Sequence, residues 1–301
     1  MLIASISGIR GTVGGKAGEG LSPADVVTFA SGYGAWIWQH KKSSDSPRVV
    51  VGRDARISGP WLRDVVCGTL NALGIDVIDL GLSTTPTVEL AVPGLEADGG
   101  MILTASHNPK EWNAMKLLNW KGEFLSASAG NEVLALAREG VTYADVEGTG
   151  TTTLDDSWLE HHVAHVLDLD LVNAEAIRGA GLKVAVDAVN SSGGIAVPLL
   201  LQSLGVEVIQ VHCEPTGDFA HNPEPLPQHL SDLTKTVIDS HCDFGISVDP
   251  DVDRLCFVCE DGSFFGEEYT LVAVADYVLT HTPGPTVSNL SSTRALREVS
   301  T

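Results

Sequence analysis

The chain has 301 residues, a hydrophobic fraction of 44% and a formal net charge of −21. A field of this sign repels nucleic acid and anionic membrane surfaces, so neither is expected as a partner. It also repels phosphorylated small molecules, so a phosphate site in this chain has to supply its own arginine and lysine side chains.

The amino-terminal segment MLIASISGIRG lacks the basic leader and the long apolar core of a signal peptide. No run of the sequence approaches the roughly 20 apolar residues that a membrane-spanning helix needs. We therefore expect a soluble, cytoplasmic protein. The sequence leaves the oligomeric state open.

Strand and helix patterns alternate along the first half of the chain. Residues 48–51 form a short β-branched run, residues 60–73 have helical periodicity, and residues 75–80 and 100–104 are apolar again. This order predicts an α/β domain with a mixed, mostly parallel sheet and helices on both faces. The Gly/Thr-rich stretch 147–153 is interpreted as a linker.

A similar order of patterns follows the linker. The predicted elements are a helix over 156–167, a strand over 182–188, a helix over 194–204, a strand over 206–211, a helix over 230–242 and a strand over 244–248. This second cycle predicts a second α/β domain.

A third cycle begins with a predicted helix over 268–280, a strand over 286–290 and the opening turn of a helix over 293–301. A domain of so few elements cannot bury its own core, so we expect a truncated third domain. The predicted organisation is tandem α/β domains over 1–147 and 154–262, with the start of a third over 263–301.

Two of the five cysteines, Cys256 and Cys259, have the CxxC spacing of some zinc and redox sites. The chain has no second CxxC, and the pair lies in the apolar run 255–259, which is typical of a strand. We interpret the cysteines as buried structural thiols in a reducing compartment.

The segment Thr104-Ala105-Ser106-His107-Asn108-Pro109 follows a small apolar strand. The carboxyl end of a strand is where α/β sheets place functional groups. A serine hydroxyl is a weak nucleophile that needs a base or cation, which His107 or Lys116 could supply. The alternative is a surface loop turned by Asn-Pro.

The segment Asp249-Pro250-Asp251-Val252-Asp253-Arg254 follows another apolar strand. Its alternating carboxylates can turn toward one point, and hard divalent cations favour such oxygen ligands. The glycine and terminal glutamate of a calcium EF-hand are absent, which favours Mg²⁺ completed by a phosphate oxygen. The alternative is a solvated acidic turn. Arg254 could pair with an acid or bind phosphate.

Two shorter motifs carry arginines. In Ser7-Gly8-Ile9-Arg10-Gly11-Thr12, flanking glycines would let the backbone approach a ligand while Arg10 donates to phosphate, although a plain turn is the more common explanation of this pattern. In Gly52-Arg53-Asp54-Ala55-Arg56, we favour a structural salt-bridge role for Arg53, Asp54 and Arg56.

In this order the four motifs resemble the α-D-phosphohexomutase superfamily, which contains phosphoglucomutases, phosphomannomutases, phosphoglucosamine mutases and phosphoacetylglucosamine mutases. TASHNP, with a lysine ten residues after its serine, matches the phosphoserine loop of that family, and DPDVDR matches its D-x-D-x-D-R metal loop. GIRG and GRDAR match its arginine loop and first-strand motif. Phe219 with the NPEP run at 222–225 resembles a recurring segment of its second domain.

The resemblance implies roles for the matching residues. Ser106 would carry the phosphoryl group. The implied ligands of Mg²⁺, beside that phosphate, are Asp249, Asp251 and Asp253. The residues implied to surround the reacting phosphate are Arg10, His107, Lys116 and Arg254, with Lys116 as the candidate for proton transfer. Pro250, Val252 and Ala114 stand where glycine is common in the family, and these changes remove no functional group.

The resemblance also implies the reaction. Family members interconvert hexose or hexosamine 1-phosphates and 6-phosphates through a phosphoserine and a sugar 1,6-bisphosphate. They have four domains, and we find neither the sugar-reading loop of the third nor the phosphate loop of the fourth. We therefore expect little mutase activity from the 301-residue chain alone. A phosphoglucosamine mutase or a phosphoglucomutase/phosphomannomutase is the leading expectation.

Two other functions remain open from the sequence. One is a Mg²⁺-dependent phosphatase that hydrolyses a phosphoserine, which a serine and an aspartate-rich metal loop also permit. The other is a non-catalytic fragment that retains only the fold and the metal site. A requirement for sugar 1,6-bisphosphate distinguishes a mutase from a phosphatase.

Overall fold

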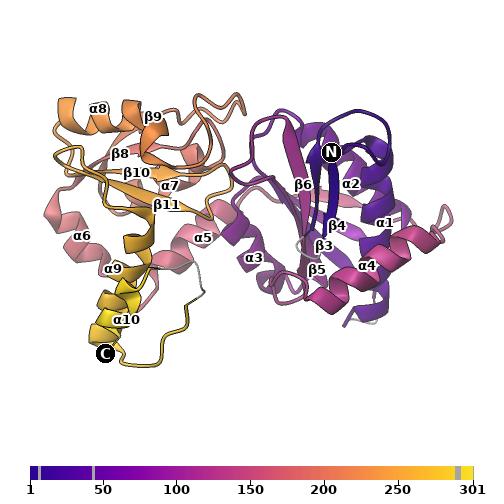
Figure 1. Cartoon of the computed structure of the whole chain (residues 1–301). Coiled ribbons are helices and arrows are strands. Elements are labelled where there is room, and N and C mark those ends of the chain that lie inside the picture. The colour runs from indigo at the N-terminus through magenta and orange to yellow at the C-terminus, as the bar shows by residue number, and fades with distance from the viewer. Residues whose placement is uncertain (6–7, 43–44, 289–292, 301) are drawn as a thin grey trace.

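The computed structural model describes residues 1–5, 8–42, 45–288 and 293–300. Figure 1 shows two α/β units side by side, the first built from the indigo-to-magenta part of the chain and the second from the salmon-to-orange part. Two yellow helices follow the second unit. The expected tandem α/β organisation is confirmed.

The first unit is built around a seven-stranded sheet in the order β1-β2-β6-β5-β3-β4-β7. Its strands are β1 (Leu2–Ser5), β2 (Gly8–Thr12), β3 (Arg48–Arg53), β4 (Asp76–Leu82), β5 (Gly99–Leu103), β6 (Trp112–Asn119) and β7 (Thr152–Leu154). The β3–β4, β3–β5 and β4–β7 pairs are parallel, and the other three pairs are antiparallel. Strand β3 lies inside this sheet, with Val50 opposite Ile78 of β4 and Gly100 of β5.

Helices cover both faces of this sheet. Its helices are α1 (Pro23–His40), α2 (Gly59–Ala72), α3 (Thr85–Gly94) and α4 (Ala127–Glu139). Val49 and Val51 pack with α1, α2 and α4 on one face, while Val50 packs with α3 on the other. Burial on both faces explains why β3 is a continuous apolar run without alternation.

The second unit has a four-stranded sheet in the order β11-β10-β8-β9. Its strands are β8 (Lys183–Asp187), β9 (Glu207–Val211), β10 (Phe244–Val248) and β11 (Leu255–Cys259). Its helices are α5 (Trp158–Leu167), α6 (Ala174–Ala180), α7 (Gly193–Ser203) and α8 (Ser231–Asp239), with a short 3₁₀ turn over Pro227–His229. Strands β8, β9 and β10 are parallel, and β11 returns antiparallel to β10.

The predicted central elements of both units are confirmed, but several others were missed. Helices α1, α3 and α4 and strands β1, β2 and β6 were not predicted. Helix α1 carries apolar or small residues around most of its circumference, which obscures the 3.6-residue period. Its start did carry a signal, since Ser22 and Asp25 form a reciprocal capping box.

Two expectations need correction. The predicted linker is wrong at Thr152 and Thr153, which belong to β7 and pair with β4, so the first sheet reaches Leu154. The strand predicted over 286–290 is wrong at residues 286–288, which form no strand, and residues 289–290 lie outside the described part. The helix expected within 293–301 is present as α10 (Ala295–Val299), which packs against α9 (Glu267–His281).

The cysteines agree with a structural role. All five are free, and Cys256 is buried on β11, whereas Cys259 at the end of that strand is only partly buried. None of the helices in the described ranges combines the length and apolar character that crossing a membrane requires.

Candidate active site

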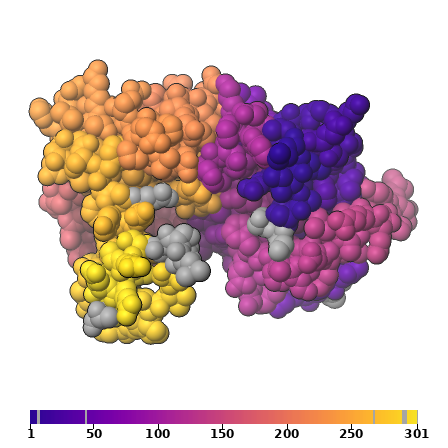
Figure 2. All heavy atoms as spheres, in the orientation of Figure 1, coloured from indigo at the N-terminus to yellow at the C-terminus, as the bar shows by residue number. Residues whose placement is uncertain are grey.

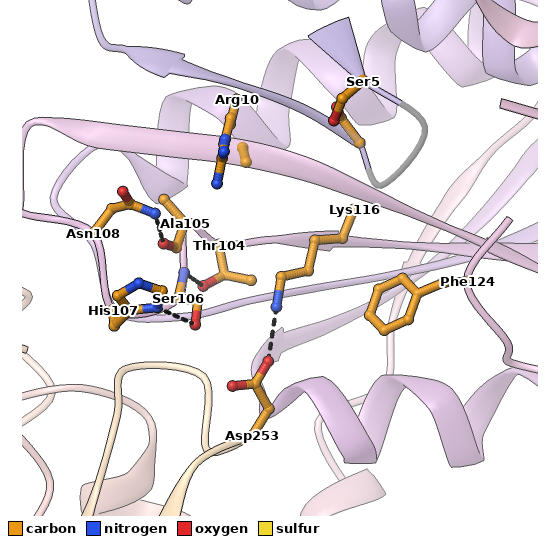
Figure 3. Close-up of a pocket in the computed structure, with 12 residues that line it drawn as sticks. Ser5, Arg10, Thr104, Ala105, Ser106, His107, Asn108, Lys116, Phe124 and Asp253 are labelled. Atoms are coloured by element: carbon orange, nitrogen blue, oxygen red, sulfur yellow. Dashed lines mark hydrogen bonds and ion pairs between the residues drawn. The ribbon is translucent and has the colours of Figure 1, made fainter. Parts of the chain in front are cut away.

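Ser106 lies in the loop that joins β5 to β6, at the carboxyl end of the first sheet (Figure 3). Its backbone is left-handed, with φ of 51°. The hydroxyl Oγ donates to Asp249 Oδ2 at 2.8 Å and lies 3.4 Å from His107 Nδ1. The predicted nucleophile and the predicted metal loop, from different units, are therefore in direct contact.

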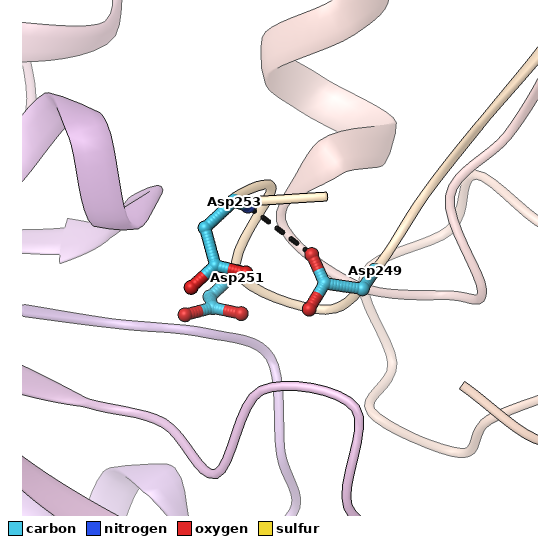
Figure 4. A group of neighbouring side chains, drawn as sticks. All are labelled: Asp249, Asp251 and Asp253. Carbon is cyan, nitrogen blue, oxygen red and sulfur yellow. Dashed lines mark hydrogen bonds between the residues drawn. The ribbon is translucent and has the colours of Figure 1, made fainter. Parts of the chain in front are cut away.

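The three aspartates form the turn between β10 and β11 (Figure 4). One oxygen from each of Asp249, Asp251 and Asp253 can be chosen so that all lie within 4.8 Å of one another. The turn is tightened by Asp249 Oδ1, which accepts the backbone N–H groups of Asp253 at 3.1 Å and Arg254 at 3.2 Å. Val252 at its tip is left-handed, with φ of 62°.

The carboxylate oxygens of these three aspartates are suitable ligands for a small hard cation. Asp249 and Asp251 are fully buried, and within the described part of the chain Asp251 Oδ1 has no hydrogen-bond partner. A buried carboxylate oxygen without a donor is costly unless a cation takes that place. Three carboxylates that converge on one point are the ligands that Mg²⁺ prefers.

Lys116 of β6 supplies positive charge to this turn. Its Nζ lies 2.6 Å from Asp251 Oδ2 and 3.0 Å from Asp253 Oδ2. Burial acts to lower the pKa of Lys116, but the two carboxylates outweigh burial and raise it. Lys116 is therefore a cation in this arrangement.

The two buried carboxyls respond in opposite directions. Burial, with the charges of Asp251 and Asp253, raises the pKa of Asp249 well above its usual value. Burial also acts to raise the pKa of Asp251, but Lys116 and the hydroxyl of Thr85 outweigh it and lower this pKa. Thr85, at the start of α3, donates from Oγ1 to Asp251 Oδ2 at 2.5 Å.

A cavity of about 270 Å³ opens above Ser106. It is lined by Ser5, Gly8, Arg10, Thr104, Ala105, Ser106, His107, Asn108, Ala114, Lys116, Phe124 and Asp253. Arg10 enters it from β2, and Lys116 points across it toward Asp253 (Figure 3). Burial, together with the charge of Arg254, lowers the pKa of His107, so its imidazole is neutral at neutral pH.

One residue predicted to surround the reacting phosphate does not line the cavity. The guanidinium of Arg254 pairs with Glu224 Oε1 at 3.6 Å and is not among the groups that line the cavity. Ser7 of the arginine loop lies outside the described residues.

The structural role favoured for the GRDAR motif is confirmed for Asp54 and Arg56, which form a fully buried ion pair at 3.0 Å. Arg53 instead donates from Nη1 to the carbonyl of Asp54 at 3.1 Å. Two contributors were missed from sequence, namely Thr85 and Phe124, which come from different elements and lie in no motif. Thr104 lies within the TASHNP segment, but no role of its own was predicted for it.

Comparisons with known proteins show which family the chain belongs to. The family described as phosphoglucomutase/phosphomannomutase, alpha/beta/alpha domain I matches residues 2–144, and its domain II counterpart matches residues 160–262. The chain is 33% identical over 295 residues to a "probable phosphoglucosamine mutase" of Methanopyrus kandleri, covering 97% of this chain and 62% of that protein. It is 34% identical over 279 residues to a phosphoglucomutase/phosphomannomutase of Thermococcus kodakarensis, covering 91% and 60%.

A solved structure shows the same likeness. A phosphoglucomutase/phosphomannomutase family protein of Burkholderia thailandensis superposes with a TM-score of 0.79 at 26% identity, covering all of this chain and 65% of that one. The chain belongs to the phosphoglucomutase/phosphomannomutase family of the α-D-phosphohexomutase superfamily. It spans about 60% of the length of the relatives that it matches.

Proposed function

We propose that this chain carries the phosphoryl-transfer centre of a phosphohexomutase that interconverts hexose or hexosamine 1-phosphates and 6-phosphates. The observation that carries the proposal is the 2.8 Å contact between Ser106 Oγ and Asp249 Oδ2, which joins a nucleophile loop to a candidate metal loop. The relatives named phosphoglucosamine mutase and phosphoglucomutase/phosphomannomutase support the substrate class.

Asp249, Asp251 and Asp253 would hold Mg²⁺ beside the phosphate on Ser106. When bound, Mg²⁺ would stabilise negative charge on the transferring phosphoryl group. Arg10 in the cavity offers the fork of donors that suits a phosphate. These groups supply the local positive charge that a protein of net charge −21 needs in order to bind a sugar phosphate.

Two transfers complete the proposed reaction. The P–O bond to Ser106 Oγ breaks while a P–O bond forms to the free sugar hydroxyl, and one proton passes from that hydroxyl to Oγ. The resulting sugar 1,6-bisphosphate reorients, and its other phosphate returns to Ser106 by the same exchange. Lys116, a cation that lines the cavity, is proposed to give a proton to the leaving Oγ of Ser106 and to take up the proton of the sugar hydroxyl, so that it ends each transfer as a cation again.

The phosphorylation half-reaction tests the proposal. The chain is incubated with glucose 1,6-bisphosphate and Mg²⁺, and intact mass with peptide mapping should find one phosphate on Ser106. Ser106→Ala should lower this labelling at least about 1,000-fold, because it removes the nucleophile. Ser128→Ala, on the exposed face of α4, is the matched control. Labelling that survives in Ser106→Ala would contradict the nucleophile assignment.

The same experiment distinguishes a mutase from a phosphatase. A phosphatase releases inorganic phosphate continuously and needs no sugar bisphosphate, whereas a mutase returns the phosphate to sugar. Chasing the labelled protein with glucose, mannose and glucosamine phosphates identifies the sugar that accepts it. Release of inorganic phosphate without sugar bisphosphate would favour the phosphatase.

A further inference from the structure

Arg56 has a completely paired guanidinium at the base of the Ser106 loop. Its side chain is fully buried. Nε donates to Asp54 Oδ2 at 3.0 Å. The four remaining N–H groups donate to carbonyls of one loop: Ser106 at 2.6 Å, Asn108 at 2.7 Å, Pro109 at 2.7 Å and Trp112 at 2.9 Å. An arginine has five N–H donors, and all five are used here.

A second chain of hydrogen bonds reaches the nucleophile from the same carboxylate. Thr104 Oγ1 donates to Asp54 Oδ2 at 2.7 Å and accepts the backbone N–H of Ser106 at 2.9 Å. The N–H and the C=O of Ser106 are therefore both tied to the Asp54–Arg56 pair. This explains how a serine is held in the left-handed conformation, which non-glycine residues adopt only when their surroundings enforce it.

Residues of the second unit pack against the Asp54–Arg56 pair. The ring of Phe219 lies 5.0 Å from the Arg56 guanidinium carbon, a cation–π distance. Gly217 lies so close that a Cβ there would be 1.9 Å from the carbonyl oxygen of Ala55. The backbone N–H of Ala55 also donates to Ser191 Oγ at 3.2 Å.

The segment around Phe219 is fixed at both ends. Lys110, in the Ser106 loop, pairs with Asp218 at 2.9 Å. On its own unit, His221 Nε2 lies 3.1 Å from each carboxylate oxygen of the buried Asp187. We call residues 217–221 the strap. Figure 2 shows the orange second unit in contact with the magenta part of the first.

We propose that Arg56 is the positioning residue for the nucleophile, and that the strap, through Phe219, couples docking of the second unit to the geometry of Ser106. Arg56 touches neither the phosphate nor the sugar. Arg56 binds four backbone carbonyls that a flexible loop would expose to water. The ring of Phe219 keeps water away from the face of the Arg56 guanidinium. The effect on catalysis rests on the proposed function, whereas the effect on loop order does not.

Arg56→Lys tests the positioning role. It keeps the charge beside Asp54 but cannot bond four carbonyls, so the rate constant for phosphorylation of Ser106 by glucose 1,6-bisphosphate should fall about 100-fold. The half-saturating bisphosphate concentration should change less than about threefold, because Arg56 makes no ligand contact. Arg53→Lys, the neighbouring arginine that does not reach the loop, is the matched control and should stay within about twofold.

Phe219→Leu tests the coupling and does not disturb the buried ion pair. Loss of the ring should slow phosphorylation about fivefold, the value of a modest cation–π contact. Mg²⁺ binding should be unchanged in every variant, which shows that the second unit is folded. A wild-type rate in Arg56→Lys, or an equal loss in both rate and Mg²⁺ binding, would overturn the positioning role.

Amide hydrogen exchange gives a readout that is independent of the reaction. In Arg56→Lys the backbone N–H groups of Ser106, Asn108 and Trp112 should exchange at least about tenfold faster than in the wild type. Phe219→Leu should give a smaller increase at the same amides. If the wild type forms no phosphoserine, the proposed function fails, but hydrogen exchange still tests whether Arg56 and the strap order the Ser106 loop. Unchanged exchange in both variants would show that they do not.

Discussion

The nucleophile loop and the metal loop occupy equivalent places at the ends of central strands, yet they are stabilised differently. The Ser106 loop is held by Arg56 of its own unit, whose charge is balanced by Asp54 and whose donors are all paired. The metal loop concentrates three carboxylates, and within the described residues the ion pairs that reach them come from Lys116 of the other unit. The first loop is held mainly by Arg56 of its own unit, with Phe219 of the second unit packed against that side chain, whereas the carboxylates of the second loop are paired by Lys116 of the neighbouring unit.

This difference has an electrostatic consequence. Removing a paired charge from a buried cluster leaves the opposite charge uncompensated. In the metal loop that cost can be met by Lys116 or by a bound cation, so the two should substitute for each other in part. Asp251 Oδ1, which has no hydrogen-bond partner among the described residues, is where a bound cation would add an interaction that Lys116 does not make.

The largest expected effect comes from Lys116→Met, which keeps the stem and removes the charge. Without Mg²⁺, the free energy of unfolding should fall by about 3 kcal/mol, because Asp251 is left buried and unpaired. Saturating Mg²⁺ should recover part of this loss. Urea unfolding with and without Mg²⁺ measures both, with Lys121→Met on an exposed turn as the control. If Mg²⁺ does not reduce this loss of stability, Lys116 and a bound cation do not substitute for each other at the metal loop.

Asp249→Asn should separate metal binding from stability. Burial and its two acidic neighbours disfavour the charge of Asp249 in the absence of a cation, so the variant without Mg²⁺ should be at least as stable as the wild type. Its affinity for Mn²⁺, followed by electron paramagnetic resonance, should weaken at least about 100-fold, because a direct ligand is lost. Unaltered Mn²⁺ affinity would show that the aspartates are not the metal site.

The smallest expected effect concerns the strap and depends on pH. Burial acts to lower the pKa of His221, but the hydrogen bond and charge of Asp187 outweigh burial and raise it. The stability that the His221–Asp187 pair adds is therefore fully present below the unfolded-state pKa of histidine, about 6.5. It is lost as the pH rises through the raised pKa of His221 in the folded protein. His221→Gln should cost about 1 kcal/mol at about pH 6 and less at about pH 9.

Urea unfolding at the two pH values measures the change, and His165→Gln on the exposed face of α5 is the control. A larger cost at the higher pH would mean that the histidine is neutral in the strap. It would also mean that the strap is not anchored by charge.

Particular residues show how far the sequence could be interpreted. Ser106 and the three aspartates were singled out because each motif follows an apolar strand, which local order shows, and because both motifs resemble those of one family. Lys116 was found only by its spacing from Ser106, since β6 was not predicted. Thr85 could not be found, because its role arises where α3 of the first unit meets a turn of the second. Residues 286–288, part of the strand expected over 286–290, form no strand, which shows that a short run of β-forming residues does not by itself define a strand.

The sequence by itself determined the chemical groups, their order and the α/β class, because these follow from residue type and local periodicity. The tertiary structure decided that Ser106 meets Asp249, that Lys116 crosses to the aspartates of the other unit, and that Arg56 holds the nucleophile loop through four carbonyls. Charge balance and backbone hydrogen bonding between distant segments depend on how the units dock, and no local pattern in the chain encodes that docking.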